Sequence, residues 1–61
     1  MEPKDFRVVD IEGEYAKLAE VKDGVALTGD EVFIALALLP MGVDVGSLLH
    51  WEMFEYTLIK Q

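Results

Sequence analysis

The sequence predicts a mainly β fold, a small antiparallel barrel of five to six short strands, SH3-like or OB-like, with one short helical turn. Three observations lead to this fold class. Short runs alternate apolar and polar residues, and glycine-containing turns separate these runs at close spacing. Length is the third observation, because 61 residues make a single domain, residues 1–61, with room for only a thin core.

The first two strands are predicted at Phe6–Glu12 and Tyr15–Val21. Apolar and acidic residues alternate at the end of the first run, which is the pattern of a half-buried strand. Gly13 lies between the two runs and tolerates the positive φ that a tight turn requires. In the second run, Ala16 and Leu18 should face inward.

A hairpin turn is predicted at Asp23-Gly24. An Asp-Gly pair between apolar runs is a strong hairpin signal. We expect a short third strand at Val25–Thr28.

The segment Glu31–Leu39 supports two interpretations. Thr28 and Glu31 have the spacing of a helix capping box, so a helix at residues 31–39 and an α+β fold form the alternative. The β-branched and aromatic residues of Val32–Ala35 favour a strand instead. We therefore predict a strand at Val32–Ala35 and one helical turn at Leu36–Leu39, because a residue that precedes proline is disfavoured in a helix.

The remainder of the chain is predicted to be a loop and a final hairpin. The loop spans Met41–Ser47 and the next strand spans Leu48–Glu52. A connection at Glu52–Glu55 then leads to the last strand at Tyr56–Lys60. This completes the five to six strands of the barrel.

The turn residues resemble those of a family of small uncharacterised bacterial β-barrel proteins, a domain of unknown function. The resemblance covers about Arg7–Ile59 and includes an Asp-Gly turn. Its motif residues here are Asp10, Glu12, Gly13, Ala16, Leu39, Pro40, Gly42, Gly46 and Leu49. Ser47 stands where the family usually has Asp. The resemblance implies a β-barrel fold and a bacterial origin, and it implies no catalytic residue and no ligand.

Composition disfavours several classes of partner. The chain has twelve acidic and five basic residues and a net charge of −7. Nucleic-acid binding is therefore unlikely, because it requires a basic surface that displaces counterions from phosphates. The longest apolar run, Val32–Met41, is about half of what a membrane helix needs. We therefore expect a soluble protein that does not bind membranes. The absence of cysteine agrees with a cytoplasmic location.

No pattern in the sequence indicates catalysis. Asp10, Glu12 and Glu14 alternate and offer oxygen ligands to a hard cation, but the solvated face of a strand has the same pattern. His50 is the single histidine and is expected to lie outward or at a sheet edge. We therefore expect no enzyme activity, and no metal site, cofactor or small-molecule substrate.

Aromatic and aliphatic residues point to protein contacts. We expect Trp51 and Phe33 to pack in the core. A base-stacking platform on an OB-like or SH3-like nucleic-acid-binding domain is the alternative, and it lacks basic neighbours. Apolar residues near the last hairpin and the helical turn exceed what a thin core can cover. The sequence therefore predicts a non-enzymatic interaction module that forms a homodimer or docks on a larger protein, with a candidate interface at Leu36, Leu38, Met53 and Phe54.

Overall fold

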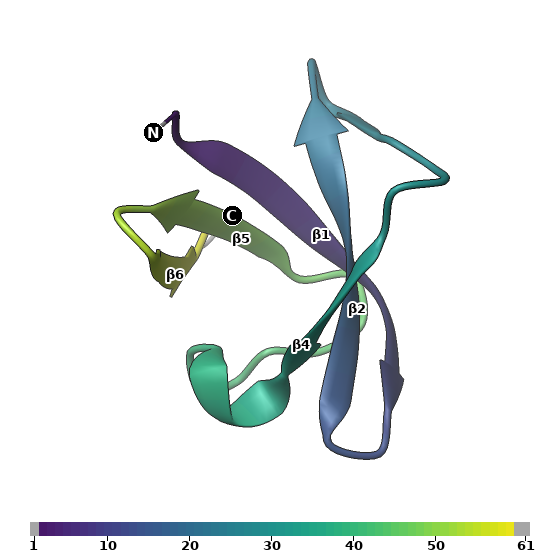
Figure 1. Ribbon diagram of the computed structural model, residues 1–61, viewed down its shortest axis with the longest axis vertical. Coiled ribbons are helices and arrows are strands. Elements are labelled where there is room, and N and C mark those ends of the chain that lie inside the picture. Colours follow the sequence, from purple (N-terminus) through teal and green to yellow (C-terminus); the bar gives the residue numbers. More distant parts are fainter. Residues whose placement is uncertain (1, 60–61) are drawn as a thin grey trace.

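The computed structural model describes residues 2–59 and confirms the mainly β fold class. Its elements are, in chain order, β1 (Lys4–Glu12), β2 (Tyr15–Lys22), β3 (Val25–Ala26), β4 (Val32–Ala35), the 3-10 turn η1 (Leu36–Leu38), β5 (Leu48–Glu52) and β6 (Glu55–Leu58). All strand pairs are antiparallel and belong to one sheet of order β3-β2-β1-β5-β6, in which β4 also pairs with β2 (Figure 1). Among the residues described, no helix is long and apolar enough to span a membrane.

Two predicted hairpin turns lie where the glycines indicated. Gly13 opens the β1–β2 turn with a φ of 58°. At the β2–β3 turn Asp23 and Gly24 have φ values of 53° and 79°. Two successive residues at positive φ are typical of a type I′ turn, whose twist matches that of the strands on either side.

The predicted split of the segment after Glu31 is confirmed, and the alternative helix at residues 31–39 is wrong. Val32–Ala35 form β4, which pairs with Tyr15–Leu18 of β2. Only Leu36–Leu38 turn, and the Leu39 N–H donates to the Leu36 carbonyl oxygen at 3.0 Å. Pairing with β2 gives the stiff side chains of β4 a sheet to pack on, and this outweighs the capping-box signal.

Two strands are shorter than predicted. The third ends at Ala26 rather than at Thr28, because Gly29 adopts a φ of 99° and the chain bends there. The Glu31 carboxylate accepts the Gly29 N–H at 2.9 Å and holds this bend. The last strand ends at Leu58, and Lys60 lies outside the described residues.

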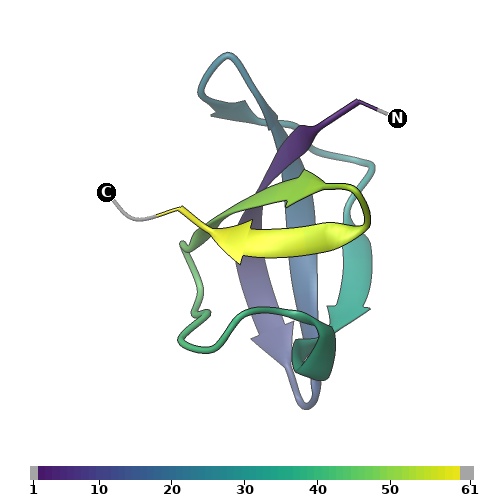
Figure 2. The same ribbon diagram turned by 90° about the vertical axis from the view of Figure 1, so that its left-hand side faces the viewer.

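The core lies inside a rolled sheet. It consists of the buried residues Val8, Ala16, Leu18, Leu39 and Leu49. Leu39 comes from the loop after η1, and this loop passes below the β5–β6 hairpin in Figure 2. No backbone pairing joins β4 to β6 within residues 2–59, so the sheet is rolled but not closed into a barrel.

Candidate interaction surface

The tip of the β5–β6 hairpin carries two exposed apolar residues, Met53 and Phe54. Their side chains are 82% and 76% exposed. Both residues have positive φ, at 52° and 65°. This conformation suits Asn and Gly and is strained for bulky side chains, by roughly 1–2 kcal/mol per residue. The hairpin tip, which we define as Met53 and Phe54, therefore displays apolar side chains at the expense of fold stability.

Phe54 packs against Trp51 and leaves most of its surface exposed. Its ring packs edge-on against the Trp51 ring, with centroids 6.1 Å apart and planes at 89°. Trp51 itself is half-buried on β5, so the expectation that it packs in the core is met only in part. The edge-to-face contact fixes the direction in which the exposed ring projects.

The two predicted interface leucines of η1 differ in exposure. Leu38 is 71% exposed and is available for contact. Leu36 is half-buried and packs against the core, so it offers less free surface for contact than Leu38 does. Because neighbouring residues of a tight turn point in different directions, only part of the Ala-Leu run can reach solvent.

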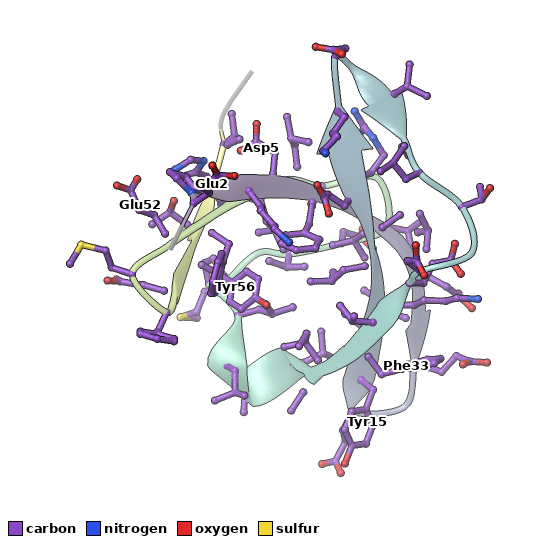
Figure 3. All side chains as sticks on the ribbon, turned by 45° about the horizontal axis from the view of Figure 1, so that its top comes forward. Glu2, Asp5, Tyr15, Phe33, Glu52 and Tyr56 are labelled. Carbon is purple, nitrogen blue, oxygen red and sulfur yellow. The ribbon has the colours of Figure 1, made fainter. Side chains whose placement is uncertain are left out.

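A second apolar surface lies on the outer face of β2 and β4, and sequence analysis missed it. Phe33 is 56% exposed and Tyr15 is 53% exposed, so the expectation that Phe33 packs in the core was wrong. The strand pairing places Phe33 beside Lys17 and Tyr15 beside Ala35, on the face away from the core (Figure 3). The sequence signal was the neighbouring Ile34, which takes the inward position and packs against the core.

His50 on β5 contacts two carboxylates, Asp5 on β1 and Glu52 on its own strand. Its Nδ1 lies 2.7 Å from Asp5 Oδ1, and its Nε2 lies 3.0 Å from Glu52 Oε1. Asp5 is the cross-strand partner of His50, and Glu52 lies two residues further along β5 on the same face. Figure 3 shows Glu2, Asp5 and Glu52 gathered at this end of the sheet, away from Tyr15 and Phe33. His50 is on the outer face, as expected from the sequence.

This arrangement favours the charged imidazolium. Carboxylate oxygens only accept hydrogen bonds, so both ring nitrogens must carry a proton to make both bonds. Hydrogen bonds to Asp5 and then to Glu52 raise the pKa of His50 above its ordinary value of 6.5. The Thr57 hydroxyl donates to the His50 carbonyl oxygen at 3.4 Å, so it contacts the backbone rather than the imidazole. The protonated His50 ring can therefore link β5 to Asp5 on β1.

We expect the stability of the chain to fall as the pH rises above 6.5. A group whose pKa is raised by folding stabilises the protein fully below its unfolded pKa, and this contribution is lost as the pH rises through the folded pKa. Urea unfolding of the wild type should therefore show a higher midpoint at about pH 6 than at about pH 8. His50→Gln should flatten this difference, and an unchanged difference in that variant would assign it to other groups.

The acidic residues considered as metal ligands do not form a cluster. Asp10, Glu12 and Glu14 are all exposed, and Asp10 Oδ1 accepts the Ile11 N–H at 2.9 Å. In the part of the chain that the structure covers, no three His, Cys, Asp or Glu side chains are placed to hold a metal ion. A bulge in β1 between Val8 and Asp10 interrupts the alternation that the sequence suggested.

Comparison with known proteins returned no match. No protein-family model matches the chain, and neither a curated protein nor a solved structure is significantly similar to it. The resemblance to small bacterial β-barrel proteins therefore stays a prediction.

Proposed function

We propose that this chain is a non-enzymatic interaction module that self-associates or docks on a larger protein. The observation that carries this proposal is the hairpin tip, where Met53 and Phe54 are exposed and held at positive φ. Polar turn residues that tolerate positive φ would stabilise this turn better than strained, exposed apolar residues do. The apolar residues are therefore better explained by a role in binding. Met and aromatic side chains are also enriched at protein interfaces.

Leu38 is a further exposed apolar residue, on the turn that follows β4, and we include it among the docking residues. The acidic charge of −7 supports contacts with proteins rather than with nucleic acid or anionic lipid. The partner surface is a second copy or a larger protein with an apolar groove that accepts the Phe54 ring.

Photo-crosslinking from the hairpin tip tests this proposal. Benzoylphenylalanine in place of Phe54 should crosslink to protein, both in the purified chain and in extract of the native cell, because the exposed ring meets the partner there. The same residue in place of Val25, an exposed apolar position on β3, is the matched control. The yield at position 54 should exceed that at position 25 severalfold. Equal yields at the two positions would contradict a role for the hairpin tip.

A further inference from the structure

Strand β4 leaves one of its edges unpaired. It pairs with β2 on one side, and no strand in residues 2–59 pairs with its other side. In the strand order, β4 lies at the end of the sheet opposite the β5–β6 hairpin. An unpaired edge presents backbone donors and acceptors to which another extended chain can bond.

The register shows which backbone groups face this free edge. The Leu36 N–H donates to the Glu14 carbonyl oxygen at 2.8 Å, which continues the β2–β4 pairing by one residue. Residues of an antiparallel strand bond alternately to one neighbouring strand and to the other. Ile34 therefore bonds to β2, whereas Phe33 directs its N–H and its C=O to the free edge.

This edge lacks the charges that usually protect a free strand. Residues 32–43 include no ionisable side chain, and this is the longest such stretch of a chain with a net charge of −7. Exposed edges are commonly protected by charged residues, proline or a bulge. Two copies of an acidic chain repel each other where carboxylates meet. The uncharged edge of β4 is where a second copy can approach without such repulsion.

We infer that β4 pairs antiparallel with β4 of a second copy, about a two-fold axis at Phe33. In this register the two Phe33 residues face each other and exchange two backbone hydrogen bonds. Val32 of each copy faces Ile34 of the other. The two sheets then form one continuous sheet across the axis.

Charges in the flanking residues agree with this register. Glu31 of one copy faces Ala35 of the other, so no carboxylate lies opposite a carboxylate. The Glu31 carboxylate also accepts the Gly29 N–H of its own chain. On the outer face the two Phe33 rings come together beside Tyr15, which covers apolar surface that is exposed in the single chain. This surface is separate from the hairpin tip, and the inference does not depend on the tip.

Phe33→Pro tests the backbone pairing directly. Proline removes the N–H that faces the free edge and leaves the hydrogen bonds between β4 and β2 in place. We expect the wild type to change from monomer to dimer between about 1 μM and about 1 mM in sedimentation equilibrium. Phe33→Pro should dimerise at least about a hundredfold more weakly, with about tenfold for each of the two bonds lost and a further loss from the missing Phe33 rings.

Phe33→Glu is the second variant and should preserve the fold of the monomer, because residue 33 is exposed. Its new carboxylate lies opposite Lys17 on the neighbouring strand β2, which favours the single chain. In the dimer the same carboxylate lies opposite its equivalent in the second copy, and this repulsion disfavours the dimer. Val25→Glu adds the same charge on the short strand β3 and should leave dimerisation unchanged. Hydrogen exchange of the Phe33 amide should slow as concentration rises, whereas exchange of the Ile34 amide should be slow at every concentration.

Three results would overturn the inference. The first is a wild type that stays monomeric at about 1 mM. The second is a Phe33→Glu variant that dimerises as strongly as the wild type. The third is concentration-dependent protection of the Tyr56 amide on β6 in place of the Phe33 amide. None of these results bears on crosslinking from Phe54, so failure of the dimer and failure of the proposed docking surface can be told apart.

Discussion

Leu18→Ala is expected to remove more than half of the free energy of unfolding of this chain. Leu18 is fully buried on β2 at the centre of the core. Truncating a buried leucine to alanine costs about 2–5 kcal/mol, because contacts are lost and a cavity remains. A domain of this size has a total stability of roughly 3–9 kcal/mol at about 0.05–0.15 kcal/mol per residue. This one substitution therefore removes a free energy comparable with the total stability of the chain.

The core is this sensitive because few side chains share it. Val8, Leu18 and Leu49 are the largest of the fully buried residues described, and each comes from a different strand. No cysteine is present, so no disulfide supports the fold. Removing the side chain of Leu18 loosens the packing of β2 on β1 and β5 together.

Urea unfolding followed by Trp51 fluorescence and by circular dichroism measures this effect. Leu27→Ala is the matched control, because Leu27 is exposed and loses the same atoms without leaving a cavity in the core. We expect the control to shift the midpoint by a fraction of the change seen in Leu18→Ala. Similar shifts in the two variants would show that the core is not centred on Leu18.

Local sequence patterns predicted most of the strands and turns of the fold. The change from β4 to η1 was predictable because Val32, Phe33 and Ile34 favour a strand and Pro40 prevents continuation of a helix. The Asp23-Gly24 hairpin was predictable because both residues tolerate positive φ. Whether the sheet closes was not predictable, because closure depends on how far the rolled edges of β4 and β6 approach each other.

The contacts of the candidate site residues depend on the pairing of strands that are far apart in the sequence, and this pairing could not be predicted. His50 and Glu52 lie two residues apart, so their common face could be read from the sequence. Asp5 is 45 residues from His50, and only the pairing of β1 with β5 brings the two together. The exposure of Phe33 was missed for a related reason, because an apolar residue on a strand faces solvent when no element covers that face. The turn at Met53 and Phe54 was predicted from the strands on either side of it. The backbone strain at these two residues could not be predicted, because it is seen only in their φ angles.

Replacing the hairpin tip with Asn-Gly should stabilise the fold and remove the docking surface. In Met53→Asn/Phe54→Gly both turn residues tolerate the positive φ that the structure gives positions 53 and 54. Relief of strain is worth roughly 1–2 kcal/mol per residue. Loss of the edge-on contact between Phe54 and Trp51 opposes it by about 0.5–1.5 kcal/mol. We expect a net gain of about 0.5–3.5 kcal/mol, and a melting temperature higher by roughly 4–8 °C for each kcal/mol.

Phe54→Ser separates the two effects in this prediction. It removes the ring and so weakens docking, but serine at positive φ keeps the strain, so this variant should gain no stability over the wild type. Thermal unfolding of the two variants beside the wild type measures stability, and crosslinking from benzoylphenylalanine at the exposed neighbouring position Glu55 measures docking. A double variant that is both less stable and still crosslinked to the partner would show that Met53 and Phe54 serve the fold. A double variant that is more stable and no longer crosslinked would show that the chain gives up stability to keep an apolar tip in contact with another protein.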